Sequence, residues 1–247
     1  MSLRLIFLTG CLFISQHAFN QSFPIVFYSD RSGISDIFMQ CPGNDEPINL
    51  TNNQSKDNCP AVSPDGRRIA FLSDRTGIEN IFIMDNDGSN VRQITQSDVS
   101  LEHPSWSPDG ERIFFVKDYN SRAEIWVANS NGTNQVRLTN NNSRDERPFL
   151  SPDASKIVFM SNRDGNYEIY TMNPDGSDQK RITFTPPFEI FPFWSPDGKY
   201  IAFQSVRDGN FEIYMVDVET KVEKRITNNA AWDGWPDFVP AESEPCR

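Results

Sequence analysis

One short phrase recurs along the chain at a constant interval. It reads "PAVSPDG" at Pro60, "PSWSPDG" at Pro104, "PFLSPDA" at Pro148 and "PFWSPDG" at Pro192, and a degenerate copy, "PDFVPAE", begins at Pro236. Each copy starts 44 residues after the one before it. A fixed period of this length is the signature of a repeat architecture, so it restricts the fold more than any other feature of the sequence.

Each repeat holds four short apolar runs separated by turn residues. Between residues 192 and 227 these runs are "PFWS", "KYIAFQS", "FEIYMVD" and "KRIT". Runs this short and rich in Ile, Val, Phe and Tyr are typical of β-strands. In the "SPDG" that separates the first two runs, Pro and Asp suit the middle of a type I turn and Gly accepts its last position. The repeat therefore predicts four antiparallel strands per unit, which is the blade of a β-propeller.

The two ends of the chain predict how the propeller closes. The segment "FPIVFYSD" at 23–30 matches the second strand of later repeats, whereas 236–240 matches a first strand with no second strand after it. We therefore predict an all-β, five-bladed propeller over residues 23–240, in which the N-terminal strands and the C-terminal strand complete one blade. This pairing would remove an open sheet edge. Residues 241–247 would form a C-terminal tail, and a six-bladed ring would need one more repeat.

The repeat "PxWSPDG…IxFxSxRDGxxEIYxMxxDGSxxxRIT" resembles the TolB-like propeller repeat. Similar repeats also occur in the propeller domains of some prolyl oligopeptidase-type hydrolases. The resemblance covers residues 23–240, nearly all of the chain after the first residues, and implies a role in a Tol–Pal system of the bacterial envelope. TolB itself carries an additional N-terminal α/β domain and usually six blades, and we expect neither here.

The first residues are typical of a secretory signal peptide. A positive charge in "MSLR" precedes the short apolar run "LIFLTGCLFIS", which is too short to span a membrane comfortably. We predict a signal peptide at 1–18 and an exported protein, periplasmic or secreted. Two alternatives remain open: "LTGC" resembles a lipobox, which would anchor a lipoprotein through Cys11, and the apolar N-terminus could stay uncleaved. No other segment is apolar enough to be a transmembrane segment.

The charge of the chain restricts the class of partner. The formal net charge is -11, whereas binding to nucleic acid needs clustered Lys and Arg. We therefore expect no nucleic-acid partner. We expect a monomer that binds a protein or peptide.

Strand direction alternates within a blade, so the loops fall on two faces. The "SPDG" turns and the turns between third and fourth strands share one face and are nearly uniform. The other face carries the "SDRTG"-type loops and the variable links between blades; we call it the link face. Variable loops on a uniform scaffold are where function usually lies. We therefore predict that the partner binds on the link face.

Carboxylates recur on the link face three residues before the Pro of each inner strand. Four of the five repeats have one there, at Asp57, Asp145, Glu189 and Asp233, and Leu101 takes the place in the other. One interpretation is an acidic ring at the channel mouth that holds a basic peptide group or a cation such as Ca²⁺, which prefers several carboxylate oxygens. The alternative is that each carboxylate accepts hydrogen bonds from backbone N–H groups of its own loop. Beyond this possible Ca²⁺ we predict no cofactor.

Two further sets of residues are candidates for partner binding. The residue directly before the inner Pro should lie at the channel mouth, which selects His103, Arg147 and Trp235. Phe188 and Trp232 fall in two adjacent links and could form one exposed apolar patch, which commonly marks a partner surface. The alternative is that these aromatic residues fill the gap between blades.

Catalytic signatures are sparse. There is no G-x-S-x-G motif, and His17 and His103 are the only histidines, so the sequence favours neither a Ser-His-Asp triad nor a multi-His metal site. We predict a non-catalytic binding module. The alternative is a glycoside hydrolase or carbohydrate-binding propeller that uses the channel carboxylates Asp57, Asp145, Glu189 and Asp233.

The cysteines suggest a disulfide bond that would hold the ring closed. Removal of the signal peptide leaves Cys41, Cys59 and Cys246, and an oxidising compartment permits a disulfide. Cys41 and Cys246 should lie on the same face of the closing blade, so we predict a bridge between them. Three free thiols or a local Cys41–Cys59 pair are the alternatives.

Overall fold

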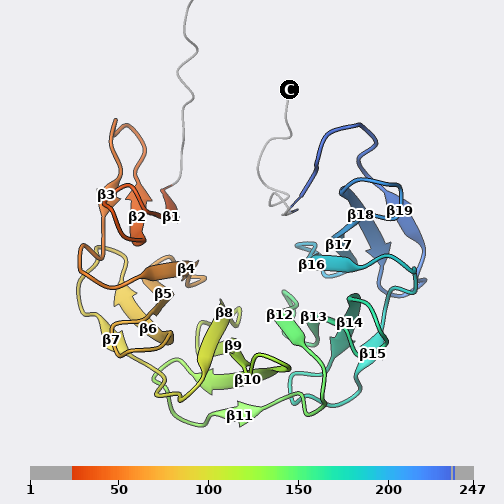
Figure 1. Cartoon of the computed structure of the whole chain (residues 1–247), viewed down its shortest axis with the longest axis horizontal. Coiled ribbons are helices and arrows are strands. Elements are labelled where there is room, and N and C mark those ends of the chain that lie inside the picture. The colour runs from red at the N-terminus through yellow and green to blue at the C-terminus, as the bar shows by residue number, and fades with distance from the viewer. Residues whose placement is uncertain (1–23, 235, 237–247) are drawn as a thin grey trace, which may run out of the picture.

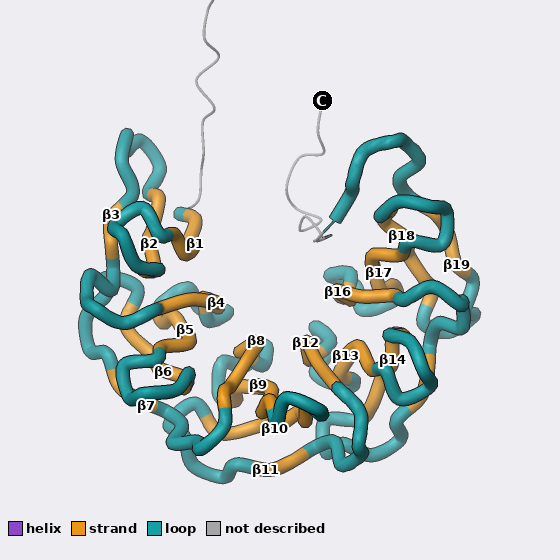
Figure 2. The backbone as a smooth tube through the Cα atoms, in the orientation of Figure 1, coloured by secondary structure: helices purple, strands orange, loops and turns teal. Residues whose placement is uncertain are grey.

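The computed structural model describes residues 24–234 and residue 236, and these form strands and loops without helices (Figure 2). There are 19 strands in five antiparallel sheets. The first sheet has three strands: β1 (Ile25–Ser29), β2 (Asp36–Gln40) and β3 (Ile48–Asn49). The other four have four each: β4 (Asp57–Val62), β5 (Arg68–Ser73), β6 (Asn80–Asp85) and β7 (Arg92–Gln93); β8 (Ser100–Trp106), β9 (Arg112–Asp118), β10 (Ala123–Asn129) and β11 (Val136–Arg137); β12 (Asp145–Leu150), β13 (Ile157–Ser161), β14 (Glu168–Met172) and β15 (Lys180–Arg181); β16 (Glu189–Trp194), β17 (Tyr200–Ser205), β18 (Glu212–Asp217) and β19 (Glu223–Arg225).

The sheets follow one another around a common centre like the blades of a propeller (Figure 1). The first strand of each four-stranded sheet, β4, β8, β12 or β16, lies nearest the centre, and the short fourth strand lies at the rim. The sheet β1–β3 and the sheet β16–β19 stand at the two ends of this arc. The predicted closing strand lies outside the described residues apart from Pro236, as do the signal peptide and the tail.

The "SPDG" phrase forms the turn between first and second strands, as predicted. In the turn at 195–198 the Gly198 N–H donates to the Ser195 carbonyl at 2.9 Å, and the Ser195 hydroxyl donates to the Asp197 carboxylate at 2.6 Å. The fourth residue has a positive φ, 68° at Gly198, which glycine adopts without steric cost. The copy "SPDA" places Ala154 in the same conformation at φ 59°, where its Cβ is unfavourable.

The Thr that ends each repeat fixes the third strand to the fourth. The backbone N–H of Ile169 donates to the Thr183 hydroxyl at 2.9 Å, and that hydroxyl donates to the buried Glu168 carboxylate at 2.7 Å. The backbone part of this arrangement is present in all five sheets, at Thr51, Thr95, Thr139, Thr183 and Thr227. A buried hydroxyl needs such partners, so the repeated Thr is structural.

The hydrophobic core lies between neighbouring blades. One cluster joins Phe114 and Ile125 of the β8–β11 sheet to Ile157 and Phe159 of the β12–β15 sheet. Two tryptophans also connect neighbouring blades. The Trp106 indole N–H donates to the Ala61 carbonyl of the preceding blade at 2.9 Å. The Trp194 N–H does the same to the Phe149 carbonyl at 3.0 Å, so adjacent blades are held by both packing and hydrogen bonds.

Candidate functional site

Each inner strand is interrupted by a β-bulge beside its Pro. The strand was expected to begin at the Pro, but it begins at least three residues earlier, and its pairing with the second strand shifts at the residue before the Pro. That residue has a positive φ in all four described inner strands: 47° at Cys59, 50° at His103, 53° at Arg147 and 56° at Phe191. A bulge bends the strand and redirects a side chain. The bulge places Cys59, His103 and Arg147 in the wall of the central cavity.

The central cavity has a volume of about 800 Å³ and mostly apolar walls. The walls come from Tyr28 of β1 and from the inner strands, with Pro60, Pro104, Trp106, Phe149 and Phe193 among them. His103 and Arg147 supply strong hydrogen-bonding groups. A concave apolar site with a few polar groups is the usual form of a ligand site.

Burial lowers the pKa of both His103 and Arg147 and leaves one nitrogen atom of each without a hydrogen-bond partner among the described residues. The pKa of His103 is lowered to about 3 by burial and by the positive charges of Arg147 and Arg144, so its imidazole is neutral at physiological pH. Its buried Nδ1 atom has no hydrogen-bond partner among the described residues. Burial also lowers the pKa of Arg147, whose guanidinium lies 4.3 Å from the centre of the Phe191 ring. The buried Nε of Arg147 likewise lacks a hydrogen-bond partner within the described part of the chain.

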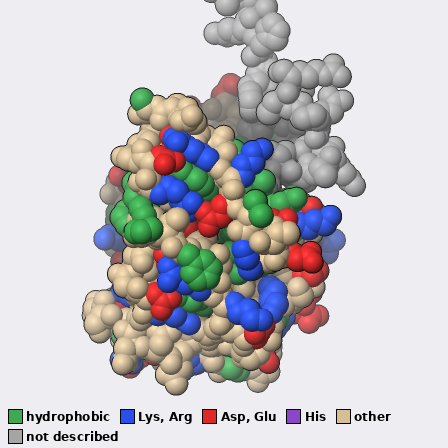
Figure 3. All heavy atoms as spheres, turned by 90° about the vertical axis from the view of Figure 1, so that its right-hand side faces the viewer, with side chains coloured by type: hydrophobic (Ala, Val, Ile, Leu, Met, Phe, Trp, Pro, Cys, Tyr) green, Lys and Arg blue, Asp and Glu red, His purple; other side chains and the backbone are tan. Residues whose placement is uncertain are grey.

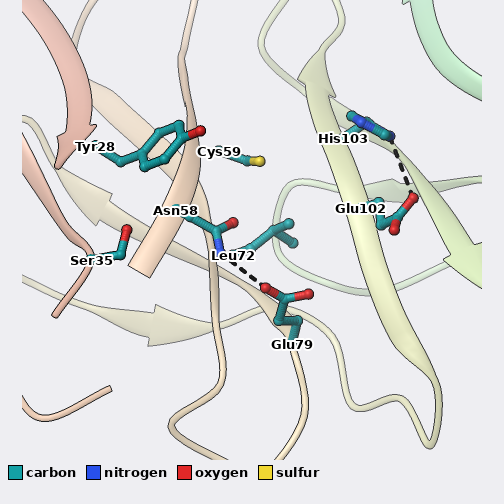
Figure 4. Close-up of a pocket in the computed structure, with 8 residues that line it drawn as sticks. All are labelled: Tyr28, Ser35, Asn58, Cys59, Leu72, Glu79, Glu102 and His103. Atoms are coloured by element: carbon teal, nitrogen blue, oxygen red, sulfur yellow. Dashed lines mark hydrogen bonds and ion pairs between the residues drawn. The ribbon is translucent and has the colours of Figure 1, made fainter. Parts of the chain in front are cut away.

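A smaller cavity of about 310 Å³ adjoins the same strands and contains two glutamates (Figure 4). Glu79 accepts a hydrogen bond from Asn58 at 2.9 Å. Glu102 lies 3.7 Å from the Nδ1 atom of His103. Burial raises the pKa of Glu102 to about 7, and the neighbouring carboxylates Asp118 and Glu146 add to the shift. Glu102 therefore changes its charge near neutral pH.

The predicted channel carboxylates are buried in ion pairs. Asp57 lies 3.1 Å from the guanidinium of Arg75, and Asp145 lies 2.8 Å from that of Arg163. Glu189 pairs with Arg207 in the same way, and burial raises the pKa of Glu189. All three carboxylates are fully buried. Each arginine belongs to an "SDRxG"-type loop and lies 18 residues after its partner.

These pairs differ from both interpretations of the carboxylates. Each carboxylate accepts hydrogen bonds from side chains, namely its arginine and a residue of its own link, such as Asn141 at 2.6 Å from Asp145. In addition, no three His, Cys, Asp or Glu residues of the described chain could hold a metal ion. The acidic ring with Ca²⁺ thus has no counterpart in residues 24–234. Asp233, half-buried, accepts a hydrogen bond from Asn229 at 2.6 Å, and Trp235 lies outside the described residues.

The aromatic residues of two adjacent links form an exposed cluster on the link face. Phe188 is 41% exposed and Trp232 is 52% exposed. Both rings contact Phe211, with centroid distances of 6.0 Å to Phe188 and 5.9 Å to Trp232. By contrast, the rim beside β15 and β19 mixes basic and acidic side chains with scattered hydrophobic ones (Figure 3). Phe188, Phe211 and Trp232 are called the aromatic cluster below.

Comparison with known proteins places the chain in a family. A family model described as the TolB β-propeller domain matches residues 20–120 and 99–189, which together are more than half of the chain. The chain belongs to the TolB β-propeller domain family. No match is found among curated proteins.

Solved structures agree with this assignment. TolB from Acinetobacter baumannii shares 25% identity at a TM-score of 0.72 and covers 86% of this chain, which spans 54% of that protein. A putative TolB from Agrobacterium tumefaciens has 23% identity and a TM-score of 0.68, with 81% of this chain and 78% of that one covered. An oligogalacturonate lyase solved with manganese shares the fold at 13% identity and a TM-score of 0.61, over 87% of this chain and 76% of that one.

The remaining predictions for this TolB-family propeller concern its cysteines and its membrane association. Cys41 and Cys59 are not joined to each other. Cys246 lies outside the described residues, so the Cys41–Cys246 bridge stays a prediction. Within the described ranges no helix is long and apolar enough to cross a membrane.

Sequence reasoning missed Phe211 and Glu102 as members of these sites. Phe211 directly precedes the third strand β18, and its contacts with two links depend on the arrangement of neighbouring blades. The repeat offered a signal, because Phe188 and Trp232 occupy equivalent positions 44 residues apart and flank the loop that carries Phe211. No such signal marked Glu102, whose neighbours Asp118 and Glu146 come from two different sheets.

Proposed function

We propose that this TolB-family propeller is an exported, non-catalytic binding module that holds a protein or peptide partner on its link face. The observation that carries the proposal is the aromatic cluster. Two of its members are large hydrophobic residues with about half of their surface exposed, on a chain of net charge -11. Contiguous exposed aromatic surface of this kind favours a protein interface, where such residues are enriched.

The cluster is suited to act as an anchor because its rings support one another. Phe211 is half-buried and lies between Phe188 and Trp232, so the two exposed rings are held in place before a partner arrives. Rings that are fixed in advance lose little conformational entropy on binding. Export is supported by the apolar segment within residues 1–18 and by the similarity to TolB proteins.

We also propose that the ring closes as five blades, with residues 236–240 pairing on β1. The backbone N–H of Asp233 donates to the Phe211 carbonyl at 3.0 Å, as that of Glu189 does to Tyr167 one blade earlier. The chain therefore leaves the sheet β16–β19 in register to begin another inner strand. Following the repeat around the ring makes Arg31 the counterpart of Arg75 and Arg163, and hence the partner of Asp233.

The glycoside hydrolase alternative receives less support. It needs two carboxylates that face a sugar at the channel. Asp57, Asp145 and Glu189 are instead fully buried and bound to arginines, so their charges are already used within the blades. The propeller neighbours that are enzymes share only the fold with this chain.

The experiment that tests the proposal is quantitative capture of partners from envelope and secreted fractions. The bait variant is Phe188→Ala/Trp232→Ala. The matched control is Val136→Ala/Val222→Ala, which removes two apolar side chains that are at least as exposed and lie in other loops. A captured protein is then purified and its Kd measured for all three baits.

We expect the cluster variant to weaken binding at least about ten-fold and the control to leave it unchanged, since buried aromatic anchors dominate interface energy. The melting temperature of both variants should stay near that of the wild type. Equal binding by all three baits would refute the proposed surface. A collapse of stability in the cluster variant would assign Phe188 and Trp232 to the core instead.

A further inference from the structure

The three rings of the aromatic cluster are not stacked flat on one another. The planes of Phe188 and Phe211 meet at 49°, and those of Phe211 and Trp232 meet at 69°. The rings therefore present their faces in different directions, and Phe188 and Trp232 have about half of their surface exposed. Aromatic faces carry a negative electrostatic potential, and sets of such rings recognise organic cations. The arrangement is suited to a cation.

The fold does not require aromatic residues at these positions. In earlier repeats the position of Phe188 and Trp232 is polar and holds Lys56, Ser100 and Arg144. The position of Phe211 varies and holds Ser35, Glu79, Ala123 and Tyr167. The propeller thus accommodates polar and small residues at both positions. The aromatic cluster is confined to the last two links, and this favours a local role over a role in the repeat.

An exposed ring next to the cluster is covered by an arginine of the chain itself. Phe184 belongs to the same link as Phe188 and is 66% exposed. The guanidinium of Arg181 lies 4.9 Å from the centre of its ring. By contrast, no Lys or Arg of the described residues lies over the ring of Phe188 or Phe211. The cluster therefore offers ring faces that a cation from outside the chain can use.

The charges around the cluster favour a cation over an anion. Asp208 and Asp233 belong to the same two loops as the aromatic residues. Arg207 precedes Asp208, but its side chain is 16% exposed and pairs with Glu189, so its charge is neutralised within the blade. The net charge of -11 adds a general attraction for basic partners.

The same surroundings favour an arginine over a lysine. Asp208 lies 2.8 Å from the guanidinium of Arg225, and the Asp233 carboxylate accepts a hydrogen bond from Asn229 at 2.6 Å. Because both carboxylates already have partners, an incoming cation depends chiefly on the rings. A guanidinium is planar and weakly hydrated and stacks on aromatic faces, whereas an ammonium is compact and strongly hydrated. Arginine is also enriched at protein interfaces, as Trp and Phe are.

We propose that an arginine side chain of the protein partner stacks on the aromatic cluster, against the exposed rings of Phe188 and Trp232. The half-buried Phe211 holds both rings in place, so the stack forms on a surface that is ordered in advance. This inference rests on the proposed function and specifies the chemistry of the group that the cluster recognises.

The test uses the full chain and a hexapeptide library with acetylated N-termini and amidated C-termini. One arm fixes a central Arg, the second fixes citrulline, which has nearly the same shape without the charge, and the third fixes Lys. Retained peptides are measured by fluorescence anisotropy against the wild type and Phe188→Leu/Trp232→Leu, which keeps the surface apolar but removes the ring faces. The matched control is Phe184→Leu, because that exposed ring is already covered by Arg181.

We expect retention in the Arg arm, and a Kd about three- to thirty-fold weaker when citrulline replaces the arginine of a retained peptide. Lysine should give an intermediate Kd. Phe188→Leu/Trp232→Leu should lose a similar factor with arginine peptides and bind citrulline peptides as the wild type does. Phe184→Leu should bind both kinds of peptide like the wild type.

Equal binding of arginine and citrulline peptides would overturn the inference. Wild-type affinity of Phe188→Leu/Trp232→Leu for arginine peptides, or retention of no arginine peptide, would overturn it too. The citrulline comparison is made on the wild type, so it is decisive even where the leucine variant does not fold.

Partner capture separates this inference from the proposed function. If Phe188→Ala/Trp232→Ala loses the partner and the leucine variant keeps it in full, the cluster is an apolar anchor and the arginine inference alone fails. If the alanine variant captures the partner like the wild type, the proposed surface itself fails.

Discussion

Arg31 and Asp233 provide a direct test of ring closure. Arg31 is prepared like the paired arginines: its Nε donates to the Ser29 hydroxyl at 3.0 Å, and its guanidinium lies over the Phe27 and Phe38 rings. Arg163 makes the same contacts with Ser161, Phe159 and Tyr170, and it also binds the Asp145 carboxylate. Closure of the fifth blade would bring Asp233 to Arg31 in that geometry.

The expected magnitude follows from the Asp145–Arg163 pair. Asp145 is fully buried, so Arg163→Gln leaves a buried charge without its cation, which costs about 3–5 kcal/mol. The hydrogen bond from Asn141 remains, and we therefore expect about 3 kcal/mol. In a closed ring Arg31→Gln should lower the free energy of unfolding by a similar amount. In an open ring it would remove only the exposed hydrogen bond to Ser29 and the exposed cation–π contacts, and we expect a loss of about 0.5–1 kcal/mol.

The assay is urea unfolding of a double-mutant cycle with Arg31→Gln and Asp233→Asn. The same cycle at Arg163 and Asp145 serves as the matched control. Closure predicts a coupling of about 1–3 kcal/mol in both cycles, because contacting charged residues are not additive. A coupling near zero for Arg31 and Asp233, beside a clear coupling for the control, would refute the closed ring.

Two further predictions concern single residues. Ala154→Gly should raise the free energy of unfolding by about 0.5–1 kcal/mol, because it relieves a left-handed alanine at φ 59°. Gly198→Ala should lower the free energy of unfolding by a similar amount. Thermal melts in which the two substitutions shift stability in the same direction, or each in the direction opposite to the one expected, would contradict the explanation. Glu102 has a folded pKa raised to about 7, so the folded state keeps its proton longer and wild-type stability should fall as pH rises from about 4.5 to 7. The Glu102→Gln protein should not show that loss and should be more stable than the wild type by about 1–2 kcal/mol at pH 8, a figure already reduced for the partial exposure of Glu102. If urea melts gave parallel pH profiles for the two proteins, Glu102 would not be the source of the pH dependence of stability.

The blade was predictable because its determinants are local. Each "SPDG" is sufficient for its own turn, and the hydrogen bonds of Ser195 and Gly198 lie within six residues. The apolar runs needed only the strand period to be recognised. The recurrence of Thr at the end of each repeat could be seen in the sequence. Its role could not, because the hydrogen bond from the third strand depends on how the strands lie in space.

The bulge was not predictable by the same means. A Pro disfavours the right-handed helical region for the residue before it and leaves the extended region as the usual outcome. Cys59, His103 and Arg147 instead adopt a positive φ, because their inner strand keeps pairing on both sides of an extra residue. Their side chains differ completely, so the position and not the residue type places them in the cavity wall. This is why the cavity had to be found in the structure.

The sheet β8–β11 shows that the acid and the arginine of the buried ion pair are kept or lost together. Leu101 replaces the acid of the inner strand there, and Tyr119 stands where Arg75 and Arg163 stand in other repeats. Keeping an arginine opposite Leu101, which is fully buried, would leave its charge without a partner. Loss of both the acid and the arginine is therefore the tolerated change. Because the two residues are lost together in one repeat, comparing the repeats indicates that they pair, which no single repeat reveals. By the same logic, the presence of both Arg31 and Asp233 at the two ends of the chain argues that they meet.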